Sequence, residues 1–181
     1  MDAARVFYTV EDVEALPEGR HVELIDGVLY DMGAPSTTHQ RLVRNLFRAL
    51  DRHVVANEGK CEVFPAPFAV YLTANRRYYL EPDLVVVCDP DKIDEKGCHG
   101  APDFVAEVVS ESSERKDYAI KLFKYRTEGV REYWIVDPRT NLVTTYHFHQ
   151  NEEEEEAKVY KIGDDIPVGI FEGLMVNLGD N

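Results

Sequence analysis

Apolar residues along the chain follow patterns that predict its secondary structure. A hairpin is predicted around Asp26-Gly27, because short apolar runs flank this two-residue turn signal. A helix is predicted from His39 to about Val55, where apolar side chains recur with a period of about 3.6 residues. Three apolar runs have the length of buried strands: Leu84–Val87, the run of Phe104 to Val109, and Tyr133 to Val136.

A second helix is predicted between the last two of these runs. Ser112-Ser113 supplies capping residues, the helix continues to about Glu128, and Gly129 is a typical C-terminal stop. A strand–helix–strand order favours a parallel or mixed sheet with a right-handed crossover. The hairpin and the later strands add antiparallel pairs. We therefore expect one α/β (α+β) domain, residues 1–181, with a mixed central sheet flanked by two principal helices.

The remaining segments are less regular. The segment from Cys61 to Leu72 contains two prolines and predicts a strand near a sheet edge. Charge, glycine and proline from Asp89 to Pro102 indicate a surface loop. Alternation from Leu142 to His149 predicts a strand, followed by a solvated turn of five glutamates and further short strands.

Two carboxylates accompany the apolar strands. Asp83 stands at the start of one, and Glu107 lies inside the next. A carboxylate in an apolar strand is costly unless it is paired, protonated or bound to a cation. Adjacent strands would bring the two together as ligands of Mg²⁺ (or Mn²⁺), with the carbonyl of Val108 as a neutral ligand. Asp83 as a turn residue and Glu107 in a structural ion pair remain alternatives.

The motifs resemble those of a known family. They are Glu23-Leu24-Ile25-Asp26-Gly27, His39-Gln40, Pro82-Asp83, Glu107-x-x, Asp117-x-x-x-Lys121-x-x-x-Tyr125-x-x-x-Gly129-Val130 and Glu132-Tyr133-Trp134-Ile135-Val136-Asp137-Pro138. Together they resemble the Uma-two family, which is classed with restriction endonucleases in the PD-(D/E)XK nuclease superfamily. The resemblance extends from about Phe7 to Leu178.

The resemblance implies a restriction-endonuclease-like fold and a metal-dependent DNA endonuclease. The superfamily lysine that follows the glutamate by two residues is Val109 here. The resemblance implies that Lys121 takes that role and that Glu23 lies at the edge of the same cluster. The expected catalytic residues are Glu23, Asp83, Glu107 and Lys121. On residue spacing alone, Asp117–Lys121 and Lys124–Glu128 also fit i,i+4 pairs on a polar helix surface. A homodimer is expected, because two symmetric sites most simply cut two strands.

The charge of the chain opposes DNA binding. The formal net charge is −14, and nonspecific affinity for phosphate depends on lysine and arginine. One concentration of positive charge lies opposite the apolar face of the first predicted helix: Arg41, Arg44, Arg48 and Arg52. This arginine stripe is either a solvated helix face or a set of phosphate contacts.

Three cysteines form no Cys-x-x-Cys pair, so we expect reduced thiols and a cytoplasmic protein, with Cys88 buried at a strand end. No apolar stretch has the ~20 residues of a membrane span. His147 and His149 fit an exposed strand face better than a metal pair, because no third ligand is evident nearby.

Two other functions remain open. A nonenzymatic binding or regulatory protein that retains the nuclease fold would explain the acidic surface and the absent third-position lysine. A hydrolase of a small phosphorylated molecule is the weaker alternative.

Overall fold

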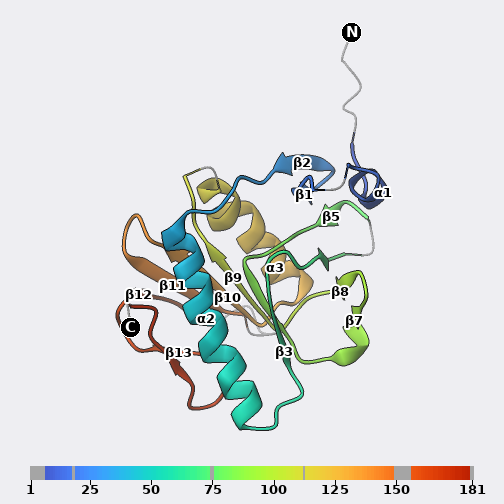
Figure 1. Ribbon diagram of the computed structural model, residues 1–181. Coiled ribbons are helices and arrows are strands. Elements are labelled where there is room, and N and C mark those ends of the chain that lie inside the picture. Colours follow the sequence, from blue (N-terminus) through green and yellow to red (C-terminus); the bar gives the residue numbers. More distant parts are fainter. Residues whose placement is uncertain (1–6, 18, 74–75, 112, 149–155, 180–181) are drawn as a thin grey trace.

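A six-stranded mixed sheet forms the centre of the computed structural model, which describes residues 7–17, 19–73, 76–111, 113–148 and 156–179 (Figure 1). Its strand order is β12-β11-β10-β9-β6-β3. The strands are β3 (Glu62–Pro65), β6 (Leu84–Val87), β9 (Phe104–Val108), β10 (Glu132–Asp137), β11 (Leu142–His147) and β12 (Glu156–Lys161). β9 and β10 are parallel and the other neighbours antiparallel. The predicted mixed sheet is confirmed, with β3 at its edge.

Three small sheets surround the central one. One has the order β2-β1-β5, another β4-β8-β7, and the third pairs β13 with β14. Their strands are β1 (Val22–Ile25), β2 (Val28–Asp31), β4 (Val70–Tyr71), β5 (Tyr78–Tyr79), β7 (Ile93–Asp94), β8 (Gly97–His99), β13 (Ile166–Pro167) and β14 (Met175–Val176). The predicted loop from Asp89 to Pro102 was wrong, because it contains the 3-10 helix η1 (Pro90–Lys92) and the β7–β8 hairpin.

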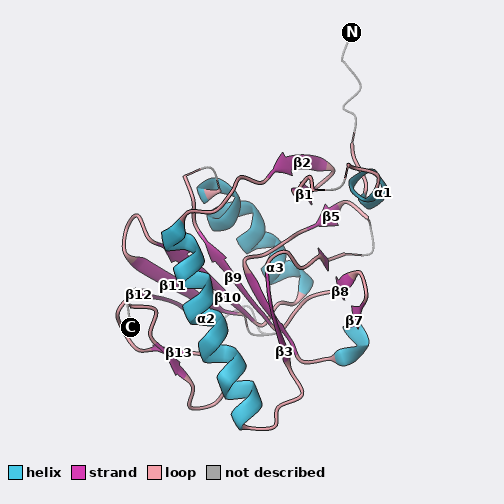
Figure 2. Ribbon diagram, in the orientation of Figure 1, coloured by secondary structure: helices cyan, strands magenta, loops and turns pink. Residues whose placement is uncertain are grey.

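The two principal helical segments cover opposite faces of the central sheet (Figure 2). α2 (Thr37–Ala56) packs on one face. The π-helix η2 (Lys116–Lys121) continues directly into α3 (Leu122–Glu128) on the other. A short helix, α1 (Val10–Glu14), precedes β1. Within the described ranges, no helix combines the length and apolar character needed to cross a bilayer.

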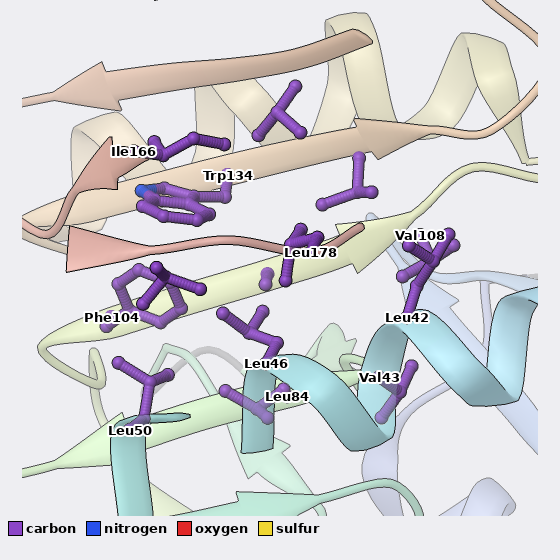
Figure 3. Packing of buried hydrophobic residues seen from close by; sticks show 14 of the residues in the cluster. Leu42, Val43, Leu46, Leu50, Leu84, Phe104, Val108, Trp134, Ile166 and Leu178 are labelled. Atoms are coloured by element: carbon purple, nitrogen blue, oxygen red, sulfur yellow. The ribbon is translucent and has the colours of Figure 1, made fainter. Parts of the chain in front are cut away.

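Alternate side chains of the central strands enter two separate hydrophobic clusters. Phe104 and Ala106 of β9 join the cluster beneath α2, whereas Val105 joins the one beneath α3. The same alternation holds in β10, where Trp134 faces α2 and Tyr133 faces α3. Figure 3 shows leucines of α2 packed over the first cluster. A strand with both faces buried needs this continuous apolar run, so Glu107 is an exception within it.

Two predicted backbone signals are confirmed. Asp26 and Gly27 both have positive φ, 49° and 76°, as a two-residue type I′ hairpin turn requires. Gly129 follows α3 in the left-handed conformation with φ 94°, which ends the helix.

The expectation of three reduced cysteines is wrong in the structure. Cys61 and Cys88 form a disulfide, while Cys98 is a buried free thiol. The β3–β6 register pairs Glu62 with Val87, and its continuation by one residue brings the two cysteines opposite each other. Burial raises the pKa of Cys98 to about 11, so that its reactive thiolate form is disfavoured.

Replacement of Leu50 by alanine tests the α2 interface. Leu50 lies on the buried face of α2 and is fully buried, so Leu50→Ala should lower the free energy of unfolding by roughly 2–5 kcal/mol. Val55 lies on the same helix with 69% of its surface exposed, so Val55→Ala should change it by less than about 0.5 kcal/mol. Urea unfolding of both variants measures the difference, and equal losses would contradict the described packing.

Candidate active site

A buried lysine pairs with two glutamates from distant parts of the chain. Lys121 Nζ lies 2.7 Å from Glu23 Oε1 and 2.8 Å from Glu107 Oε1. Glu23 comes from β1 and Glu107 from β9, while Lys121 is the last residue of η2. No more than 5% of any of these side chains is exposed. Glu107 shares the strand face of Val105, which is why it points toward the helix that carries Lys121.

Asp117 and Tyr125 complete this cluster from the same helical segment. Asp117 Oδ1 is 3.5 Å from the ammonium of Lys121, and the hydroxyl of Tyr125 donates to Glu107 Oε1 at 3.0 Å. Both residues are buried. The interpretation of Asp117–Lys121 as an exposed surface pair is therefore wrong. Lys124–Glu128 is the more exposed of the two pairs, with an N···O distance of 2.7 Å.

Asp83 is held at the start of β6 by two donors. Its Oδ2 accepts a hydrogen bond from the amide of Val108 at 2.7 Å and lies 3.1 Å from His39 Nε2. β6 pairs with β9 with Leu84 opposite Ala106, and one more residue of this register places Asp83 opposite Glu107. The two predicted metal ligands thus lie on adjacent strands, and 15% of the Asp83 side chain is exposed.

His39 lies in the first turn of α2, above Asp83. Ser36 caps this helix by accepting a hydrogen bond from the backbone amide of His39 at 3.1 Å, so the cap does not involve the imidazole of His39. Its Nε2 faces Asp83, and its buried Nδ1 has no hydrogen-bond partner in the structure. His39 therefore orients Asp83, a role that the sequence did not predict.

The cluster contains more negative than positive charge. The carboxylates are Glu23, Asp83, Glu107 and Asp117, and the ammonium groups are Lys121 and Lys116, whose Nζ lies 3.3 Å from Glu23 Oε2. Burial raises the pKa of Glu107 well above its ordinary value, and the Lys121 ammonium only partly offsets this. Burial also raises the pKa of Asp117.

Lys121 is held in its charged form. Burial alone would lower its pKa, but Glu107, Glu23 and Asp117 outweigh burial and raise it well above the ordinary value. Burial raises the pKa of Tyr125 as well, so its hydroxyl keeps the proton that it donates to Glu107. The site therefore contains a fixed ammonium group and more carboxyl groups than cationic side chains.

The donor chemistry fits Mg²⁺. Among the residues that the structure describes, no group of three or more His, Cys, Asp or Glu side chains is placed to hold a metal by itself. Mg²⁺ is commonly held by only one or two carboxylates, with water and substrate phosphate as its other ligands. Asp83 and Glu107 are the pair that fits this requirement, and a divalent cation would balance the excess negative charge.

The other predicted features lie apart from this cluster. All members of the arginine stripe are exposed on α2: Arg41, Arg44, Arg48 and Arg52. His147 Nδ1 lies 3.8 Å from Glu132 Oε1, on the partly buried face of β11, and His149 lies outside the described residues. Trp134 is a core residue whose Nε1 donates to Glu132 at 2.7 Å.

The raised pKa of Asp117 predicts how stability depends on pH. The folded protein binds this proton more tightly than the unfolded chain, so stability falls as pH rises from the ordinary value of 3.8 through the folded pKa. Asp117→Asn removes this loss. The free energy of unfolding of the variant, relative to the parent, should therefore increase with pH in this window, by at most about 1.4 kcal/mol per pH unit.

Chemical unfolding between pH 4 and pH 8 measures this difference. Glu128→Gln is the matched control, because it removes a carboxylate from the more exposed i,i+4 pair of the adjacent helix. Relative to the parent, its stability should not increase with pH, because it loses an ion pair with Lys124 rather than a buried carboxylate. A difference between Asp117→Asn and the parent that stays constant or decreases with pH would contradict the assignment.

The chain is similar to proteins of known sequence over most of its length. Residues 10–178 match the model of the Uma2 family, which is described as "Putative restriction endonuclease". Two uncharacterized proteins of Synechocystis sp. are 27% and 28% identical to it over 118 and 126 residues. These matches cover 64% and 69% of this chain, and the chain spans only 65% of the length of each relative.

A solved structure shares the fold. A "putative nuclease belonging to DUF820" from Anabaena variabilis superposes with a TM-score of 0.74, at 19% identity and 94% coverage of both chains. At this identity the likeness establishes the architecture alone. Because the family model matches nearly the whole chain, including every residue of the buried cluster, the protein belongs to the Uma2 family of restriction-endonuclease-like proteins.

Proposed function

We propose that this protein is a divalent-metal-dependent endonuclease that hydrolyses phosphodiester bonds of DNA. The convergence of Glu23, Asp83, Glu107 and Lys121 supports this proposal most strongly. These residues come from separate elements, yet they meet where two adjacent strands carry acids. Burial of so many charges is costly, and a structural core would gain more from apolar residues of similar volume.

Asp83 and Glu107 would hold Mg²⁺ (or Mn²⁺). When bound, the metal supplies charge that polarises the phosphate and lowers the pKa of a bound water. The chain itself prepares the two carboxylates. His39 and the Val108 amide fix Asp83, while Tyr125 and Lys121 fix Glu107. Such fixed partners keep ligand oxygens oriented before a cation or substrate arrives.

Lys121 would act on the reacting phosphate. In hydrolysis, the water oxygen bonds to phosphorus, the bond to the leaving sugar oxygen breaks, and that oxygen takes a proton. Negative charge builds on the phosphoryl oxygens in the transition state. The buried ammonium of Lys121 is already oriented by Glu23 and Glu107, so it would stabilise this charge without reorganisation.

Two further features belong to the proposal. The exposed arginine stripe of α2 would contact DNA phosphates, because His39 connects the start of this helix to Asp83. A homodimer would bring two such sites to the two strands of a duplex.

The nonenzymatic alternative has specific support. Lys121 already occupies the position of a counter-cation between Glu23 and Glu107, and the chain carries a net charge of −14. A protein that retained the fold for binding alone would need no metal. Metal binding therefore separates the two functions.

Addition of Mg²⁺ should raise the melting temperature of the parent protein. A ligand that binds only the folded state stabilises it by RT ln(1 + [L]/Kd), or about 2.7 kcal/mol at a hundredfold excess over Kd. Asp83→Asn should abolish the shift, whereas Asp103→Asn, at the far end of β9, should retain it. Differential scanning fluorimetry with Mg²⁺ and Mn²⁺ measures this. An unshifted parent would favour the nonenzymatic alternative.

Loss of the Lys121 ammonium should abolish cleavage. Lys121→Met is expected to reduce Mg²⁺-dependent cleavage of plasmid DNA by at least about 100-fold, the effect of removing one preorganised charge-stabilising group. The variant should also be less stable, because buried carboxylates lose their partner. Lys124→Ala, which removes a more exposed lysine from α3, is the control.

The cleavage assay compares both variants with the parent on DNA and on RNA, after thermal unfolding has established that each is folded. Undiminished cleavage by folded Lys121→Met would remove Lys121 from the mechanism. If the parent cleaves RNA but not DNA, RNA replaces DNA as the proposed substrate.

A further inference from the structure

A second lysine, Lys116, lies at the edge of the buried cluster. Its Nζ is 3.3 Å from Glu23 Oε2 and 5.1 Å from the centre of the Tyr30 ring. The side chain of Lys116 is 14% exposed, compared with 4% for Lys121. Glu23 therefore has a lysine on each oxygen, one enclosed and one closer to solvent.

The π-helix explains how both lysines reach the same carboxylate. Lys116 and Lys121 are the first and last residues of η2 and are five positions apart. In an α-helix, five residues at 3.6 per turn would separate their directions by about 140°. The wider i→i+5 turn of a π-helix brings such residues to one side. π-helical segments are rare in proteins, and those that occur are frequently found at functional sites. Here the segment gives Glu23 its second cation.

The two lysines differ in the contacts that they can still make. The Lys121 ammonium is surrounded by Glu23, Glu107 and Asp117 within 3.5 Å. Lys116 has a single carboxylate partner in the cluster, at a longer distance, and the face of Tyr30 on another side. An ammonium has three donors, so Lys116 retains donors for an incoming anion.

The surrounding charge favours a cation at this position. A phosphate that approaches Asp83 and Glu107 meets a cluster with excess carboxylates on a protein of net charge −14. Lys116, the more exposed lysine of the cluster, would offset this repulsion for a phosphate that approaches from its side. A bound phosphate would also share Lys116 with Glu23, leaving Lys121 to hold Glu23 in place.

We propose that Lys116 binds a phosphate of the nucleic-acid backbone at the entrance of the site, while Lys121 remains inside the carboxylate cluster. This assignment rests on the proposed nuclease function. It divides the two cationic roles between two lysines of one helical turn, with Lys116 in substrate binding and Lys121 at the reacting phosphate.

Salt-dependent DNA binding tests the division. A short DNA duplex is titrated with protein in EDTA, so that cleavage does not interfere, and fluorescence anisotropy is recorded at several salt concentrations. Lys116→Ala should weaken binding and reduce the slope of log K against log [salt] by about one unit, the loss of one phosphate contact. Lys116→Arg should restore the slope. The control Lys124→Ala, which removes a more exposed lysine from α3, should leave it unchanged.

The outcomes separate this inference from the proposed function. If the parent binds and cleaves DNA but Lys116→Ala keeps the parental slope and affinity, Lys116 is not a phosphate contact. A parent that neither binds nor cleaves nucleic acid would instead refute the proposed function. Circular dichroism of each variant establishes that the loss is not one of folding.

Discussion

The ammonium of Lys121, enclosed by Glu23 and Glu107, constrains the rest of the structure. Each carboxylate would be costly to bury alone, and neither is near the other in sequence. The first hairpin must therefore dock beside the central sheet, and the helix after β9 must return across it. Removal of Lys121 leaves two buried carboxylates without their shared cation, so the cluster couples three distant segments of the chain.

The sheet topology places the remaining site residues around this ion cluster. β9 lies between β6 and β10, so Glu107 is near the middle of the six-stranded sheet and Asp83 enters from its antiparallel neighbour. The helix between the parallel strands β9 and β10 covers the face to which Glu107 points. α2 covers the opposite face and brings His39 to Asp83 at the strand end. Acids, lysine and histidine thus meet because the fold brings β1, β6, β9, η2 and α2 together at one site.

The local patterns of the sequence predicted most of the framework, because apolar runs, the Asp26-Gly27 turn and Gly129 depend on nearby residues. The family resemblance, rather than spacing, selected Lys121, since i,i+4 pairing described an exposed lysine equally well. Contacts that depend on register and packing could not be predicted. The pairing of Cys61 with Cys88 follows from the β3–β6 register, and Lys116 reaches Glu23 only through a π-helix.

The protein keeps its buried ions for chemistry, at a cost in stability. The most direct test is the free energy of unfolding of Glu107→Gln, Lys121→Met and the double variant, measured in urea without divalent metal. Lys121→Met should lose roughly 3–5 kcal/mol, because it leaves Glu23 and Glu107 buried without their shared cation. Glu107→Gln should lose less, because Lys121 keeps Glu23 as a partner, and the double variant should lose less than the sum of the two single changes. A double variant that loses the sum of the two single changes would contradict the claim.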